Sequence, residues 1–155
     1  MSRAVSLFLQ RYWRFSRGLT LAVEAAVIDG EGRFILVRGP RERLWRLPGG
    51  PVEKGEAAGD AVSRVLRTTA AIEPGGPAEL FGIYRAPSHA GSDHVALMVV
   101  RTWSAWTPNK QGSRPRSSRG EVGAFGPGEL PGDTDPVVAA RIADVMRGAP
   151  TPDEA

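Results

Sequence analysis

A glycine-rich segment followed by an acidic loop and a helix-compatible run is the part of the chain best suited to chemistry. It runs from Trp45 to Ile72 and reads WRLPGGPVEKGEAAGDAVSRVLRTTAAI. Pro48 begins a predicted turn in which Gly49 and Gly50 permit positive φ angles and close approach of the backbone. We therefore expect a ligand phosphate and a helix to meet here, although the helix carries few carboxylates.

Carboxylates in and around this segment are the candidates for catalysis or for holding a metal ion. Glu53 and Glu56 lie in the acidic loop, and Glu121 belongs to a later predicted strand. Because Mg²⁺ is often held by one or two protein carboxylates together with the phosphates of the substrate, a small acidic set is compatible with a metal site. Asp60 lies four residues before Arg64, which favours a salt bridge on the helix surface.

Other catalytic arrangements are missing or weak. The chain has no cysteine, which excludes disulfides, thiolate metal sites and a thiol nucleophile. His89 and His94 lack a third ligand and are poor metal candidates. No Ser-His-Asp arrangement, Walker loop or dinucleotide fingerprint is present. Trp45 could stack on a base, but packing is the commoner role of a tryptophan at such a position.

The charge of the chain suits an anionic ligand. The formal net charge is +3 and the isoelectric point is about 9.9. Basic residues form two groups, for which a solvated surface is the alternative interpretation. The groups are Arg38, Arg41, Arg43 and Arg46, then Arg114, Arg116 and Arg119. We expect phosphate binding by Arg38, Arg41, Arg46, Gly49 and Gly50, and a nucleotide-like small molecule rather than a specific nucleic acid.

The hydrophobic pattern predicts the elements that position this segment. Strands are expected at 20–28, 33–38, 45–47, 79–85, 94–103 and 121–125, and helices at 56–71 and 136–146. The first two strands are expected to form a hairpin, and the first helix lacks a short capping side chain. Residues 104–120 predict a long loop. Strands around one internal helix, with a second helix at the end, indicate an α+β or α/β sandwich with a mixed sheet.

The length of 155 residues and the hydrophobic content of 41% suit a single domain. We expect it at 18–148, between an amphipathic N-terminal segment at 1–17 and a disordered tail at 149–155. The apolar run of the N-terminal segment, Ala4 to Leu9, is too short for a secretory signal or a membrane span. Packing, a dimer contact or an interfacial membrane helix would explain it. We expect a cytoplasmic protein without a transmembrane segment, and a homodimer is possible.

The motifs in this segment resemble the signature of the Nudix hydrolase superfamily, G-x5-E-x7-R-E-U-x-E-E-x-G-U, where U is a bulky aliphatic residue. Gly50, Glu56 and Arg64 occupy its first glycine, glutamate and arginine. Leu66 and Ile72 occupy its aliphatic positions. The predicted strands and the C-terminal helix fit the α/β/α sandwich of that superfamily over most of residues 20–147.

The same alignment places four other residues at fixed positions of the signature. Val65, Thr68 and Thr69 stand where the family has three helical glutamates, and Ala71 stands where it has glycine. In the family those glutamates bind Mg²⁺ or Mn²⁺, which clamps the pyrophosphate of a nucleoside diphosphate linked to another group. With these neutral residues the helix face needs no cation to offset repulsion, and it has no carboxylate to bind one. The difference from the signature therefore predicts a helix adapted to function without metal.

Three functional hypotheses follow. The first is a Nudix-fold protein with absent or strongly reduced pyrophosphohydrolase activity that binds a nucleotide or another phosphorylated ligand. The second is a working hydrolase with a displaced metal site built on Glu53, Glu56 and Glu121, although the resemblance gives Glu56 a structural ion pair with Arg64. The third is an interaction protein that acts through its N-terminal segment or the 104–120 loop.

Overall fold

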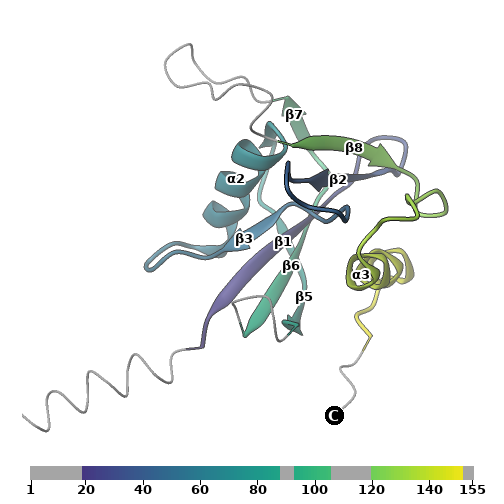
Figure 1. The fold of residues 1–155 in the computed structure, drawn as a ribbon. Helices are drawn as coiled ribbons and strands as arrows, with labels where there is room; N and C mark the ends of the chain where they lie inside the picture. Colours follow the sequence, from purple (N-terminus) through teal and green to yellow (C-terminus); the bar gives the residue numbers. More distant parts are fainter. Residues whose placement is uncertain (1–18, 88–92, 106–119, 152–155) are drawn as a thin grey trace, which may run out of the picture.

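The computed structural model describes residues 19–87, 93–105 and 120–151. In chain order its elements are β1 (Leu21–Val27), β2 (Phe34–Arg38), β3 (Gly49–Pro51), α2 (Ala58–Thr69), β4 (Ile72–Pro74), β5 (Glu79–Arg85), β6 (His94–Val100), β7 (Trp103–Ala105), β8 (Glu121–Phe125) and α3 (Pro136–Arg147). Figure 1 shows α2 and α3 on opposite sides of the central strands. Neither of these helices is long and apolar enough to cross a bilayer.

The central sheet has four strands in the order β3-β1-β6-β5. β1 and β6 run parallel in its middle, and β3 and β5 pair antiparallel at its two edges. Two short antiparallel sheets, β2 with β8 and β4 with β7, complete the fold. The predicted α+β class with a mixed sheet is therefore confirmed.

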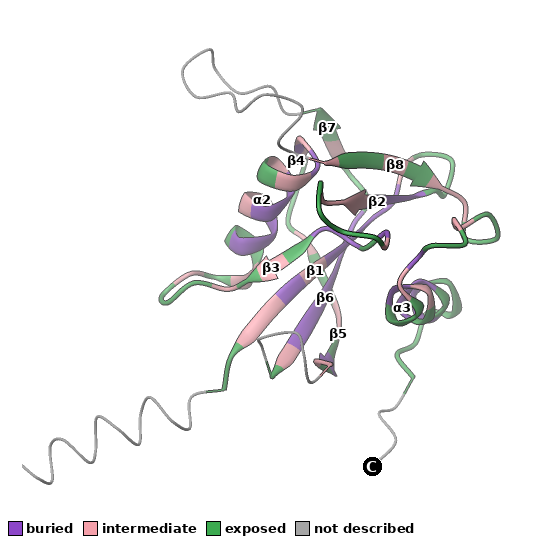
Figure 2. Ribbon diagram, in the orientation of Figure 1, coloured by how far each residue is buried: buried purple, intermediate pink, exposed green. Residues whose placement is uncertain are grey.

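The alternation of side chains along β1 divides the hydrophobic core into two layers. Val23 and Ala25 belong to the layer under α2, where Leu66 is fully buried. Ala26 belongs to the layer under α3, which includes Ile142. Figure 2 shows the buried residues concentrated on the central strands and on the inward faces of both helices. A strand between two apolar layers is buried on both faces, which explains why β1 is almost continuously apolar.

The two helices begin in different ways. α2 starts after Ala57, which makes no capping hydrogen bond with its side chain, as the sequence predicted. α3 starts after Asp135, whose carboxylate accepts a hydrogen bond of 2.9 Å from the backbone N–H of Val137. It ends at Gly148, which has a φ of 80° and adopts the left-handed conformation that glycine tolerates best.

The predicted hairpin between the first two strands is wrong. Within the described residues, they meet as an isolated bridge between Ile28 and Phe34 and then diverge into different sheets. The turn between them is nevertheless tight, because Asp29 accepts hydrogen bonds of 2.9 Å from the backbone N–H groups of Glu31 and Arg33. β1 pairs with β3 and β6 instead, since its two apolar faces require a central position.

The predicted glycine turn is a strand. Gly49 and Gly50 pair with Glu24 and Val23 of β1, and neither glycine has a positive φ. The predicted strand at 45–47 makes isolated bridges, one of them between Val37 and Arg46. The short edge strand thus begins a few residues later than the apolar pattern indicates, because pairing with β1 determines which residues form it.

Two further strand boundaries differ from the predictions. The predicted strand at 94–103 is divided into β6 and β7 by Arg101 and Thr102. The carbonyl of Thr102 accepts a hydrogen bond of 2.7 Å from the N–H of Gly75. β7 then pairs with β4, which lies outside the strands expected from the sequence. Proline is tolerated at the end of so short an edge strand, which is why Pro74 did not prevent it.

The tail predicted to be disordered from Ala149 is attached to α3 over residues 149–151. The carboxylate of Asp144 accepts two hydrogen bonds from Thr151, one of 2.9 Å from the backbone N–H and one of 2.6 Å from the hydroxyl group. Asp144 also accepts a hydrogen bond of 2.9 Å from the Tyr84 hydroxyl group of β5. This buried carboxylate therefore joins the tail, α3 and the edge of the central sheet.

Candidate functional site

A cleft of about 500 Å³ opens between the β1–β3 edge of the sheet and α3. This volume lies within the range of small-molecule binding sites. Its lining includes Glu24 on β1, Gly49 and Gly50 on β3, Thr69 on α2, Arg141 on α3, and Arg46. The glycine segment and the end of the helix predicted to carry the site therefore do face a common space.

The two glycines of β3 are required by close contacts rather than by a turn. A Cβ atom on Gly49 would lie 2.9 Å from the carbonyl oxygen of Val23 and 3.0 Å from Cγ of Glu24. A Cβ atom on Gly50 would lie 3.1 Å from Cγ2 of Val65 on α2. The expectation of close backbone approach is thus met, whereas that of positive φ is not.

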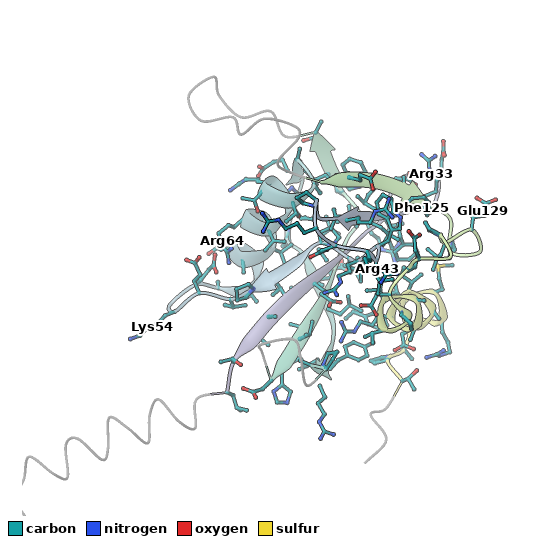
Figure 3. All side chains as sticks on the ribbon, in the orientation of Figure 1. Arg33, Arg43, Lys54, Arg64, Phe125 and Glu129 are labelled. Atoms are coloured by element: carbon teal, nitrogen blue, oxygen red, sulfur yellow. The ribbon has the colours of Figure 1, made fainter. Side chains whose placement is uncertain are left out.

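Glu56 and Arg64 form the ion pair that the family resemblance implied. Nε of Arg64 lies 2.8 Å from Oε1 of Glu56, and Nη2 lies 2.9 Å from Oε2. Nη2 also donates to the carbonyl of Pro51, and Oε2 accepts from the N–H of Glu53. The Arg64 guanidinium, aided by the Glu53 N–H, lowers the pKa of the Glu56 carboxyl to about 2. In Figure 3 Arg64 lies on α2 beside the loop that carries Lys54.

The other carboxylates of the segment are more exposed. The side chain of Glu53 is 68% exposed, and its Oε1 lies 4.0 Å from Nε of Arg64. Asp60 is exposed and makes no salt bridge with Arg64 in the described structure, contrary to the prediction from their spacing. Arg64 turns instead toward the loop, where Glu56 offers two oxygens in a bidentate geometry.

The face of α2 that carries metal-binding glutamates in the family is neutral and satisfied by its own helix. The hydroxyl of Thr69 donates to the carbonyl of Val65 at 2.7 Å, and that of Thr68 to the carbonyl of Arg64 at 3.0 Å. Val65 is buried against the sheet. Hard divalent cations prefer carboxylate oxygens, so this set does not fit the metal of the family.

Glu121 begins β8 in the separate β2–β8 sheet and is held there by Arg38. Its Oε2 accepts two hydrogen bonds from this arginine, one of them 2.7 Å from Nε. Nη1 of Arg38 donates to Asp133 at 2.6 Å, and the guanidinium lies 4.7 Å from the ring centroid of Trp45. These contacts occupy Arg38, which the sequence suggested as a phosphate ligand.

Trp45 is a packing residue. It is 9% exposed, and its ring meets that of Phe125 edge to face with centroids 5.1 Å apart. Figure 3 shows Phe125 at β8, away from the loop that carries Lys54. The interpretation of Trp45 as part of the core is therefore the one that the geometry supports.

The remaining candidates are divided between the cleft and the solvent. Arg46 lines the cleft, is 48% exposed and lies 3.7 Å from a carboxylate oxygen of Asp135. Arg41 and Arg43 are exposed. His94 begins β6, whereas His89, the second basic group (Arg114, Arg116, Arg119), the N-terminal segment and most of the 104–120 loop lie outside the described residues.

No cluster of three histidine or carboxylate side chains suited to a metal ion occurs in the described residues. Glu53 and Glu56 lie together at Arg64, and Glu121 lies with Arg38 on the β2–β8 pair. The structure thus brings two of the three predicted acids together and places the third in a different ion pair.

Ala71, which stands where the signature has glycine, adopts a backbone conformation that favours glycine. Its φ is 53°, and it is the sole non-glycine residue with a positive φ in the described part of the chain. A Cβ atom in this left-handed region costs roughly 1–2 kcal/mol. Ala71 is therefore a strained position, at which glycine would fit without steric cost.

Sequence reasoning missed Glu24 and Arg141, which form an ion pair within the cleft. Nη1 of Arg141 lies 2.5 Å from Oε2 of Glu24, across 117 positions of the chain. Each residue carried a local signal, because Glu24 is the one charge in the apolar run TLAVEAAVI and Arg141 interrupts the apolar face of the last helix. Their separation concealed the partnership.

Comparison with known proteins identifies the family. The NUDIX domain family matches residues 18–140. The MutT NUDIX hydrolase of Burkholderia pseudomallei shares 20% identity, with 83% of this chain and 99% of that chain covered and a TM-score of 0.66. A NUDIX hydrolase from Nitrosomonas europaea shares 19% identity, with 88% and 94% covered and a TM-score of 0.65. A UDP-X diphosphatase shares 17% identity, with 92% and 71% covered and a TM-score of 0.56.

These structural likenesses, all below a quarter identity, show a common fold. No curated protein matches the chain. The family match extends over all the described strands and into α3. This chain belongs to the Nudix family.

Proposed function

We propose that this Nudix chain binds a nucleotide-like phosphorylated small molecule in the cleft between β1, β3 and α3, with pyrophosphohydrolase activity that is absent or strongly reduced. The observation that carries the proposal is the face of α2. Val65 is buried there, and the hydroxyl groups of Thr68 and Thr69 bond to the helix backbone. Thr69 lines the cleft, so this neutral face meets the space where a ligand would lie.

The two carboxylates nearest to this face are poorly suited to replace the missing ones. Both oxygens of Glu56 are bonded to Arg64, and one of them also accepts from the N–H of Glu53. A pKa of about 2 makes Glu56 a weak base at neutral pH. Glu53 is exposed. Losing a metal and a general base removes two separate contributions to catalysis, the second worth about 10²- to 10⁴-fold.

Ligand binding is supported by the size of the cleft and by its cationic rim. Arg46 lines the cleft, and its contact of 3.7 Å with Asp135 is long enough to leave donors for a phosphate. Arg41 is exposed in the preceding loop and is a second candidate. One of the similar structures is a diphosphatase of UDP-X, a phosphorylated nucleotide-like compound.

The proposal is tested by measuring binding and turnover on the same sample. Purified protein is incubated with nucleoside triphosphates, ADP-ribose and UDP-glucose, each with and without Mg²⁺ or Mn²⁺. We expect ligand-dependent thermal stabilisation without a metal requirement, and no metal-dependent release of nucleoside monophosphate or phosphate. Clear metal-dependent hydrolysis of any of these compounds would overturn the loss of activity, and failure of every nucleotide to bind would overturn the ligand class.

The displaced metal site on Glu53, Glu56 and Glu121 is the alternative. No contact among the described residues favours it, because Glu121 is engaged by Arg38 on another sheet. Its test is the pair of variants E56Q and E121Q, which should abolish any hydrolysis while leaving the fold intact. Activity that survives both substitutions would eliminate this alternative.

Three further expectations accompany the proposed function. We expect the protein to be cytoplasmic, and a homodimer is one assembly to be tested. The hypothesis of an interaction protein concerns residues 1–17 and 104–120. Deletion of residues 1–16 should abolish association without changing ligand binding if that hypothesis holds.

A further inference from the structure

A carboxylate stands at an unusual place in the central sheet. Glu24 lies in the middle of β1 on the same side as Ala26, which belongs to the apolar layer under α3. Its neighbours across the strands are Leu97 on β6, which is fully buried, and Gly49 on β3. A charged side chain placed beside a hydrophobic layer is costly unless a partner or a ligand compensates for the lost water.

The partner of Glu24 is a buried arginine from the other side of the cleft. Arg141 is 4% exposed, and its Nη1 lies 2.5 Å from Oε2 of Glu24. The guanidinium lies 5.2 Å from the ring centroid of Tyr84. Its Nε is buried and has no hydrogen-bond partner among the described residues. A buried pair with an unsatisfied donor is a poor source of stability, because apolar residues of similar volume usually serve the fold as well or better.

The pair leaves one oxygen of the carboxylate for another molecule. Oε2 of Glu24 is taken by Arg141, whereas Oε1 accepts no hydrogen bond from the described residues. The Glu24 side chain remains 21% exposed, and both residues line the cleft. Gly49 contributes by lacking a Cβ atom, which would lie 3.0 Å from Cγ of Glu24. The cleft therefore presents a carboxylate oxygen whose position is fixed by a buried guanidinium.

We propose that Glu24 selects the base of the ligand by accepting hydrogen bonds from an edge with adjacent N–H donors, as in guanine. A carboxylate can only accept hydrogen bonds. Guanine presents N1–H beside its exocyclic amino group, whereas adenine and cytosine present a ring nitrogen acceptor beside theirs and uracil presents one N–H between two carbonyl groups. Arg141 is a positioning residue in this arrangement. The inference rests on the proposed function for its ligand class, a nucleotide-like phosphorylated molecule.

The experiment compares three nucleotides that share ribose and diphosphate and differ in the base. GDP, IDP and ADP are titrated calorimetrically into the full-length protein without metal. Inosine keeps the N1–H and lacks the amino group, so IDP separates the two donors. We expect GDP to bind about tenfold or more tightly than ADP, with IDP between them, since a hydrogen bond to a charged group is worth at least that factor. Equal dissociation constants for GDP and ADP would overturn the inference.

Two variants separate selection from structure. E24Q keeps the size of the side chain and, with its carbonyl oxygen held by Arg141, turns an amide N–H₂ toward the cleft. We expect E24Q to lose about tenfold or more in GDP affinity and to reverse the preference toward ADP. E79Q removes a charge from an exposed position on β5 outside the cleft and should leave the order of the three nucleotides unchanged.

The double variant E24L/R141M tests the role of the pair in a protein that is expected to fold. It removes both charges together, so no unpaired arginine remains, and we expect a thermal midpoint equal to or above that of the natural chain. GDP and ADP should then bind with similar affinity. A lower midpoint with preserved discrimination would show that the pair is structural and would overturn the inference.

The outcomes also separate this inference from the proposed function. If none of the three diphosphates binds, the role of Glu24 is overturned, and the proposed ligand class fails as well only when the nucleotides of the thermal-stability test also fail to bind. If all three bind equally, the ligand class stands and the role of Glu24 is overturned. If a metal-dependent reaction is found in the turnover assay, the preference for GDP in the metal-free titration still decides the role of Glu24.

Discussion

Arg64 holds both carboxylate oxygens of Glu56, at 2.8 Å from Nε and 2.9 Å from Nη2. This pair links α2 to the loop that precedes it. The same arginine also donates a hydrogen bond to the carbonyl of Pro51, which links α2 to β3. Two residues of the family signature thus form a structural ion pair, while neutral side chains stand where the signature has its helical glutamates.

The first prediction concerns the contribution of this pair to stability. The Arg64 guanidinium lowers the pKa of Glu56 from 4.5 to about 2. A lowered folded-state pKa contributes stability that is complete above the ordinary pKa and is lost as the pH falls through the folded value. We expect E56Q to lower the thermal midpoint by a few degrees at pH 7, and this difference to shrink between pH 4.5 and pH 2.

The control for E56Q is E53Q in the same loop. Glu53 is 68% exposed, and its contact with Arg64 is as long as 4.0 Å. Its removal should change the midpoint little at any pH, because an exposed ion pair contributes little. Equal effects of E53Q and E56Q would contradict the structural role of the bidentate pair.

The second prediction concerns the strained backbone at Ala71. Its φ of 53° should make A71G stabilising, because glycine adopts this region without steric cost. Relief of about 1–2 kcal/mol, less the greater freedom of glycine in the unfolded chain, leaves a net gain of roughly 0.5–1 kcal/mol. Urea denaturation followed by circular dichroism measures this change.

The matched control is the neighbouring alanine. Ala70 ends α2 with a φ of −120°, which any residue adopts. We expect A70G to destabilise the protein by about 1–2 kcal/mol, since glycine gains conformational freedom in the unfolded state and the substitution also removes the buried methyl group of Ala70. If both glycine variants move the free energy of unfolding in the same direction, the argument from φ at Ala71 is wrong.

The sequence was sufficient wherever a local pattern determined the structure. The apolar periodicity of α2 and α3, the late strand β8 and the Glu56–Arg64 pair all depend on residues close in the chain or on an established spacing. The N-terminus of α2 without a cap was also predictable, because capping needs one short polar side chain at one position.

Pairing over long distances could not be predicted in the same way. β1 pairs with β6 rather than with β2, and β4 exists because β7 lies beside it. The pair Glu24–Arg141 joins positions 117 residues apart. A single charge in an apolar strand signals that some partner exists, but nothing in its local sequence says which one. Glu24 and Arg141 could therefore be noticed in the sequence as isolated charges in apolar segments, but the sequence did not show that they form one site.

The third prediction concerns the attachment of the C-terminal tail. Asp144 is 4% exposed and accepts hydrogen bonds from Tyr84 and Thr151. D144N removes the charge and mismatches these donors, so we expect a loss of about 2–4 kcal/mol in the free energy of unfolding at pH 7. D60N, at an exposed position on α2, should cost far less.

The pH dependence of this effect has a definite sign. Burial raises the pKa of Asp144, but hydrogen bonds from Thr151, Tyr84 and Arg147 outweigh it and hold the pKa at about 2, below the ordinary value of 3.8. The stabilisation is thus complete above pH 4 or so and is lost as the pH falls toward 2. Urea titrations of the natural chain and D144N at pH 7 and pH 3 should show a smaller difference at pH 3. An unchanged difference would refute the linkage.

The fourth prediction tests the neutral face of α2 by restoring the carboxylates of the family. T68E/T69E places two acids one helical turn after Arg64 and beside the cleft, which Thr69 already lines. Like charges at adjacent positions repel, so the variant should be less stable without metal, and Mg²⁺ or Mn²⁺ should raise its thermal midpoint by a few degrees through binding to the folded state.

The control is T68Q/T69Q, which has the same shape and no charge. Neither it nor the natural chain should respond to the metals beyond the effect of equal ionic strength, because amide and hydroxyl oxygens alone bind these cations weakly. Val65 is left unchanged since it is buried against the sheet, where a glutamate would add a desolvated charge. A metal-dependent shift of the natural chain as large as that of T68E/T69E would show that another group of this protein binds the cation, and the proposed loss of the metal site would then be wrong.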